Sequence, residues 1–163
     1  MLVIRNAEKS DVLSMLQIEN YEIANGNATF DLDAKTLEEK ETWFQSLHTR
    51  YPIIVAELDD YVVGYAYVSP FNPKQAYQQT VELSVYVDAS YRGRKIGKSL
   101  MEYILEECEN ERFHTVISKI TKGNEGSVRL HKQVGFQLTG TLKEVGFKFN
   151  TWQDVEIYQY FCK

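Results

Sequence analysis

The segment Arg92–Lys98 holds the residues of this chain that are best suited to bind an anion. Its sequence, RGRKIGK, places four cations and two glycines between an apolar run, Thr80–Val87, and a helical pattern that begins near Ile96. The first N–H groups of a helix have no acceptor within the helix and carry the positive end of its dipole. A basic, glycine-containing turn at this position predicts a site for phosphate or a similar anion.

Two nucleotide motifs and one plain alternative compete with this interpretation. Gly97-Lys98-Ser99 looks like the end of a Walker A loop, but that loop needs a glycine where this chain has Arg92. No later apolar strand ends in an aspartate suited to magnesium, and the turn has no G-x-G dinucleotide motif. A solvated basic turn is the plain alternative, but it does not explain why glycines alternate with the cations.

The hydrophobic periodicity predicts the elements that position this turn. Strands are expected at 2–5, 53–58, 61–68, 80–87, 115–120, 136–145 and 152–161, and helices at about 11–25, 36–47, 96–109 and 127–133. Ser10 or Asp11 is expected to cap the first helix, Thr36 and Glu39 to form a capping box, and Asp59-Asp60 to turn a hairpin. The order β-α-α-β-β-β-α-β-α-β-β predicts an α/β (α+β) fold with helices covering a mostly antiparallel sheet, in one domain spanning 1–163.

Composition narrows the class of protein. A chain of 163 residues with 44% hydrophobic residues and a net charge of −5 is globular, and it lacks the broad basic face that nucleic acids or membrane surfaces require. Two distant cysteines, Cys108 and Cys162, and three unclustered histidines predict neither a disulfide framework nor a metal site. With no signal peptide or membrane-spanning run, we expect a soluble cytoplasmic protein.

The basic turn resembles the pyrophosphate loop Q/R-x-x-G-x-G/A of the GCN5-related N-acetyltransferase (GNAT) superfamily. Arg92 and Gly97 match that pattern, and Lys95 stands in place of its middle glycine. Five further motifs occur in the order of the phosphinothricin and methionine-sulfoximine N-acetyltransferase branch: NATF (27–30), WF (43–44), TVELSVYVD (80–88), SVRLHKQVGF (127–136) and VGFKFNTWQDV (145–155). The resemblance covers nearly the whole chain.

This resemblance implies the GNAT fold, with a V-shaped split between 83–87 and 115–120 that holds acetyl-CoA as co-substrate and no metal. Backbone groups along the first strand would pair with the pantetheine arm, and the basic turn would hold the pyrophosphate. The residues that it assigns to acetyl-CoA are Val85, Tyr86, Val87, Arg92, Gly93, Arg94, Lys95, Ile96, Gly97, Lys98 and Asn124.

The resemblance also implies two catalytic residues. Acetyl transfer needs a neutral amine, so a base must remove a proton from the acceptor. Glu82 lies at the position of the family's proposed base. The alternative to a base role is that Glu82 is simply an exposed carboxylate on a strand. His131 lies where many members carry a tyrosine that protonates the leaving thiolate, and we expect it to share the acid and base work. His48 and His114 are expected to be surface or packing residues.

The acceptor site departs from the branch. Members that acetylate phosphinothricin carry two arginines after the Pro-Phe pair, where this chain has Asn72 and Lys74. Phe30, Lys74 and Tyr77 are the candidates for acceptor binding. The expected acceptor is the primary amine of a small amino-acid-like molecule; a protein N-terminus or lysine, or a non-catalytic acyl-CoA-binding module, remain alternatives. The branch resemblance also implies a homodimer.

Overall fold

The computed structural model describes all residues from Met1 to Lys163. Its element order confirms the predicted one. The elements are β1 (Leu2–Asn6), α1 (Val12–Asn25), α2 (Leu37–Leu47), β2 (Ile53–Leu58), β3 (Tyr61–Pro70), β4 (Thr80–Val87), α3 (Ile96–Asn110), β5 (Thr115–Thr121), α4 (Glu125–Gln133), β6 (Gln137–Lys148) and β7 (Thr151–Phe161).

The seven strands form one sheet in the order β1-β2-β3-β4-β5-β7-β6. Every neighbouring pair is antiparallel except β4 and β5, which run parallel near the middle of the sheet. The parallel pairing covers only the positions from Thr80 with Thr115 to Glu82 with Ile117. Because β4 continues to Val87 and β5 to Thr121, the two strands separate beyond this point. The predicted V-shaped split is therefore confirmed.

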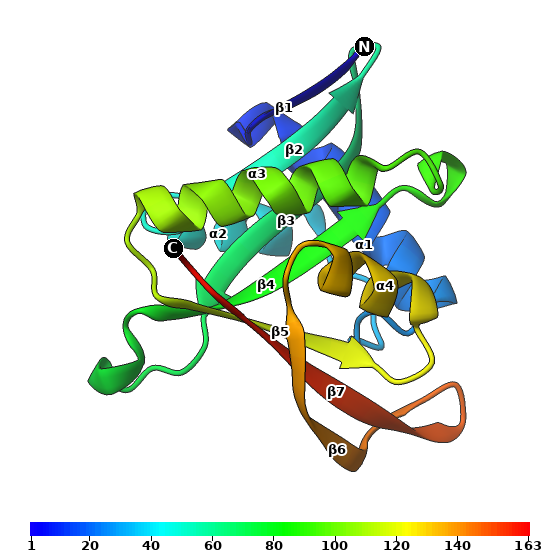
Figure 1. Cartoon of the computed structure of the whole chain (residues 1–163). Coiled ribbons are helices and arrows are strands. Elements are labelled where there is room, and N and C mark those ends of the chain that lie inside the picture. Colours follow the sequence, from blue (N-terminus) through cyan, green and yellow to red (C-terminus); the bar gives the residue numbers. More distant parts are fainter.

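Helices cover both faces of the sheet, with α3 and α4 in front of it and α1 and α2 behind it in Figure 1. The larger core lies under α3 and includes Leu100 and Ile104 packed on buried side chains of the central strands. The second core joins α1 and α2 to β2 and β3 through Met15, Phe44 and Tyr65. Side chains along a strand alternate between the two faces, so β4 contributes to both layers.

Local signals account for most element boundaries. Thr36 and Glu39 form the predicted capping box at the start of α2, and Asp59-Asp60 has the positive φ angles, 50° and 70°, of a tight hairpin turn. Asp11 is the N-cap residue of α1, as predicted, but its side chain does not cap that helix: the carboxylate accepts hydrogen bonds from Arg5 and from the Glu8 N–H instead. None of the four α-helices combines the length and the apolar content that a membrane span requires.

The start of α4 differs from the sequence expectation. This helix begins two residues before its predicted start, because the Asn124 side chain accepts a hydrogen bond from the Ser127 N–H at 3.3 Å and caps it. The cap places Asn124 at the mouth of the split between β4 and β5, where the sequence resemblance assigns it to acetyl-CoA.

Candidate active site

A cavity of about 1010 Å³ opens where β4 and β5 separate. The two diverging strands, the start of α3, one side of α4 and the 28–31 segment with α1 all contribute to its walls. Of the residues assigned to acetyl-CoA from the sequence, all but Arg94 line it. Glu82, His131 and Phe30 line it as well.

The wall formed by β4 presents unpaired backbone groups to this cavity. On its other side β4 pairs with β3 as far as Val87, but its pairing with β5 ends at Glu82. Every second peptide group from Leu83 onward therefore lacks a strand partner on the cavity side. An extended ligand that carries amide groups can pair with such an edge as an added strand.

Lys95 takes a backbone conformation that favours glycine, the residue at this position of the loop pattern that the sequence resembles. Its φ of 62° lies in the left-handed region, where glycine carries no steric penalty and other residues do. The Lys95 carbonyl nevertheless accepts the Ser99 N–H at 3.1 Å, so the turn closes correctly onto α3. Gly97 is needed for packing, since a Cβ there would lie 3.1 Å from Leu130 of α4.

We expect Lys95→Gly to raise the free energy of unfolding by about 1 kcal/mol, because it removes the steric strain that a Cβ causes at a left-handed φ. Urea denaturation of the variant beside the parent protein measures the change. Arg94→Gly is the matched control, because Arg94 is an exposed neighbouring cation without a positive φ, and this variant is expected to bring no gain. Equal or lower stability of Lys95→Gly would contradict this account of the turn.

The four cations of the basic turn differ in their contacts and in whether they line the cavity. Arg92 Nη2 lies 3.0 Å from Oε2 of Glu22, a nearly buried carboxylate on α1 that is 70 residues away in sequence. Arg94 is exposed, lies over the Tyr91 ring and does not line the cavity. Lys95 and Lys98 do line it, together with Arg129 of α4, which sequence reasoning missed.

Glu82 lies at the last paired position of β4, where the split begins. Its Oε1 is 3.1 Å from Nζ of Lys119 on β5, so the carboxylate is held by an ion pair across the seam. Sequence reasoning missed Lys119, although it is the only charged residue in β5 and a lone charge in an apolar strand could have signalled a role. Both side chains line the cavity on the face of the sheet that carries α1.

His131 is buried on the opposite face, on α4, against the rings of Phe136 and Tyr158. Its Nδ1 lies 2.7 Å from the Ser127 carbonyl oxygen, which can only accept, so Nδ1 carries the proton. Burial lowers the pKa of His131, while the hydrogen bond to Ser127 opposes that shift. The imidazole is therefore neutral near pH 7, and Nε2 is the ring nitrogen with a free lone pair.

The lowered pKa of His131 predicts a loss of stability in acid. Below the ordinary value of 6.5 the unfolded chain binds a proton that the folded protein excludes, so unfolding becomes easier as the pH falls. We expect the free energy of unfolding of the parent, relative to His131→Asn, to fall by up to about 1.4 kcal/mol per pH unit below pH 6.5. Urea denaturation of both proteins between about pH 7.5 and 5 measures it; parallel curves would contradict the prediction.

One end of the cavity lies toward α1. Phe30 lines it and packs over Gly146 of β6, where a Cβ would collide with the Phe30 ring. Burial raises the pKa of Tyr67 to about 12, opposed by a hydrogen bond with Ser84, so its hydroxyl stays protonated. Charges of both signs complete this end: Glu19, Asp31 and Lys35.

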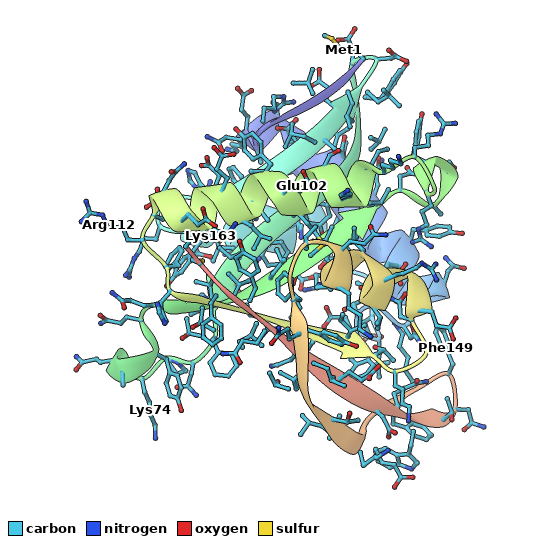
Figure 2. The ribbon with its side chains drawn as sticks, viewed as in Figure 1. Met1, Lys74, Glu102, Arg112, Phe149 and Lys163 are labelled. Carbon is cyan, nitrogen blue, oxygen red and sulfur yellow. The ribbon has the colours of Figure 1, made fainter.

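Two predicted acceptor residues lie elsewhere. Lys74 and Tyr77 belong to the loop between β3 and β4 and do not line the cavity. Figure 2 shows Lys74 at the tip of this loop, directed away from the body of the molecule. Tyr77 is 41% exposed and its ring packs against Phe71 at 5.6 Å between centroids. The structure therefore does not bring these two side chains together with Phe30.

Comparison with known proteins identifies the family. Residues 4–157 match the model of the Acetyltransferase (GNAT) domain. The chain is 34% identical to a phosphinothricin N-acetyltransferase of Streptomyces viridochromogenes over 96% of its own length and 85% of that protein.

Solved structures of acetyltransferases share the fold of this chain. A phosphinothricin acetyltransferase of Sinorhizobium meliloti in complex with AcCoA superposes with a TM-score of 0.96 at 32% identity, covering 99% of this chain and 88% of that one. A ribosomal-protein-alanine N-acetyltransferase of Brucella melitensis gives 0.96 at 36% identity, covering 98% and 99%. These matches confirm the predicted fold and the prediction of an acetyl-CoA-dependent acetyltransferase. The chain belongs to the GNAT acetyltransferases.

Proposed function

We propose that this enzyme moves the acetyl group of acetyl-CoA to the primary amine of a small amino-acid-like molecule. The observation that carries the proposal is the open edge of β4, which runs along the cavity toward the start of α3. In this arrangement Val85, Tyr86 and Val87 pair with the pantetheine arm. The N–H groups of Ile96, Gly97 and Lys98 at the start of α3 receive the pyrophosphate, with Lys95 and Lys98 adding charge.

The two faces of the sheet separate the two ends of the reaction. Glu82 and Lys119 lie on the face of α1, with Phe30 and Tyr67, so the amine approaches from that side. His131 lies on α4 at the opposite face and lines the cavity, which supports a role for it at the sulfur. A free N–H of β4 polarises the thioester carbonyl and stabilises the oxyanion that forms there.

The proton balance follows from this division. The acceptor ammonium loses one proton to Glu82, and the neutral amine then attacks the carbonyl carbon, forming the C–N bond. When the C–S bond breaks, its electron pair leaves with the sulfur. Neutral His131 accepts the second amine proton at Nε2 and delivers it to the thiolate, so that amide, CoA and one released proton are the products.

The class of acceptor rests on two observations. Asp31 and Lys35, at the end of the cavity that lies toward α1, offer charges of both signs, which suits a zwitterionic molecule. Curated relatives at 32–34% identity are named for phosphinothricin and for methionine sulfoximine and sulfone. A peptide N-terminus is the second candidate, favoured by the likeness to the ribosomal-protein-alanine N-acetyltransferase.

A CoA-release assay over a panel of amines tests the proposal. The panel contains methionine sulfoximine, phosphinothricin, free amino acids and short peptides with N-terminal alanine, and calorimetry measures acetyl-CoA binding in parallel. Turnover of the small amines supports the proposal, and turnover of peptides alone supports the second candidate. Acetyl-CoA binding without turnover of any amine would favour a non-catalytic acyl-CoA-binding module.

We also propose that the enzyme is a cytoplasmic homodimer. Large apolar side chains along the β6–β7 hairpin are about half exposed, and a second copy could cover them: Leu138, Leu142, Val145, Phe147, Phe149 and Trp152. Cys108 and Cys162 are free thiols, as is usual in a reducing compartment. Light scattering of the parent and of Phe147→Glu tests the dimer, which the added charge should dissociate.

A further inference from the structure

Ser118 is a buried polar side chain without a hydrogen-bond partner. Only 2% of the residue is exposed, it lines the cavity, and its Oγ has no donor or acceptor in the protein. Buried hydroxyls normally form hydrogen bonds, because leaving one unpaired costs free energy. An orphaned hydroxyl at the wall of a ligand cavity indicates that the ligand supplies the partner.

The position of Ser118 along the split shows which part of the ligand that is. The last paired positions are Glu82 and Ile117, so Ser118 is the first β5 residue beyond the point of separation, level with Leu83. From Val87 to Leu83 a strand spans about 13 Å. A pantetheine arm that starts from pyrophosphate at α3 and follows β4 over this length brings its sulfur to the apex of the split.

The face on which Ser118 lies agrees with this placement. Val116 and Ile120, two residues away on either side, belong to the core under α3, so the Ser118 side chain projects toward that face. Its cross-strand partner on β7 is Tyr158, whose ring lies 6.3 Å from that of His131 between centroids. Ser118 and His131 therefore lie on the sulfur side, whereas Glu82 and Lys119 lie on the amine side.

We propose that Ser118 is a further catalytic residue, whose hydroxyl donates a hydrogen bond to the CoA sulfur as the C–S bond breaks. This inference rests on the proposed function. The hydroxyl forms no covalent bond and loses no proton: the electron pair of the broken bond stays on sulfur, and the O–H dipole stabilises that charge. Hydrogen bonds to charged groups are the strong ones, so the effect should be larger on the thiolate than on the thioester.

The ionisation of bound CoA tests this role without any acceptor. Ultraviolet absorbance of the thiolate reports the titration of the CoA thiol in complexes with the parent, Ser118→Ala and Ser118→Thr. The titratable groups facing this position are His131 on α4 and Tyr158 on β7, with Glu82 and Lys119 across the sheet, and all remain in the three proteins. Desulfo-CoA, which lacks the sulfur, is the matched ligand control.

We expect the thiol of CoA bound to Ser118→Ala to titrate about one pH unit higher than in the parent, which equals about a tenfold loss of preference for thiolate. Ser118→Thr should restore the parent value, and desulfo-CoA should bind all three proteins equally. The apo form of Ser118→Ala should be at least as stable as the parent, because the substitution removes an unpaired buried group.

Unchanged thiol titration in Ser118→Ala would overturn this role. Equal weakening of CoA and desulfo-CoA would overturn it too, since that result indicates a change in cavity shape. If the parent itself bound neither CoA nor acetyl-CoA, the proposed function would fail together with this inference. CoA binding with an unaltered titration removes only the inference about Ser118.

Discussion

Replacing Glu82 by glutamine is expected to lower turnover about 100- to 1000-fold at neutral pH, within the usual range for loss of a general base. Glutamine keeps the size of the side chain but cannot accept the ammonium proton. Acetyl-CoA binding should change little, because backbone groups of β4 and the start of α3 hold that substrate in the proposed mode. CoA release with an accepted amine measures the loss, and calorimetry measures the binding.

The pH profile and a control variant isolate the base function. Above the pKa of the acceptor the amine is already neutral, so the deficit of Glu82→Gln should narrow there. Lys119→Gln removes the ion-pair partner of Glu82 but keeps the carboxylate. A half-exposed ion pair contributes little free energy, so the loss of turnover in this variant should stay below about tenfold. Full turnover of Glu82→Gln at neutral pH would remove this residue from the mechanism.

The order of the elements could be predicted because local chemistry determines it. A capping box at Thr36 and Glu39 and an Asp59-Asp60 turn set boundaries with short-range hydrogen bonds and φ angles. The side-chain contacts at the cap of α1 could not be predicted in this way. The Asp11 carboxylate accepts hydrogen bonds from Arg5 of β1 and from the Glu8 N–H rather than from α1, and the preference of Asp for helix starts does not report that competition.

The site was predictable where its residues share a strand or a turn. The backbone wall of β4 and the basic turn follow from contiguous sequence. Lys95 replaces a glycine of the loop pattern, but the turn still forms because Lys95 adopts a left-handed φ at a cost in free energy. The contacts between distant segments were not predictable. Glu22 and Arg92 form an ion pair although they are 70 residues apart in the sequence. Lys74 and Tyr77 lie outside the cavity because of where the loop between β3 and β4 lies relative to it.

The ion pair between Glu19 and Lys40 is another contact between distant segments that the sequence did not predict, and it lies in the core behind the end of the cavity that faces α1. Both side chains are almost fully buried, at 4% and 2% exposure, with Glu19 Oε1 and Lys40 Nζ 3.1 Å apart. The ammonium also lies 3.7 Å from the centre of the Trp43 ring and donates to the Tyr65 hydroxyl at 3.3 Å. Burial lowers the pKa of Lys40, and Glu19 opposes that shift.

Removing one member of this pair should therefore be costly. We expect Lys40→Met to lower the free energy of unfolding by about 3 kcal/mol, because it leaves a buried carboxylate with only Lys35, 3.8 Å away, as a neighbouring cation. The double variant Glu19→Gln with Lys40→Met should recover most of that loss, since neither charge then remains unpaired. Urea denaturation of the two singles and the double measures the coupling.

Lys98→Met is the matched control for the size and charge of the substitution. Lys98 pairs with Glu102 at 3.8 Å on the exposed side of α3, so its loss should change stability by less than about 0.5 kcal/mol. Equal effects of Lys40→Met and Lys98→Met would contradict a stabilising role for the buried pair. A large effect that the double variant fails to recover would assign the loss to the contacts of Lys40 with Trp43 and Tyr65 instead, because those contacts stay broken when the charge of Glu19 is removed.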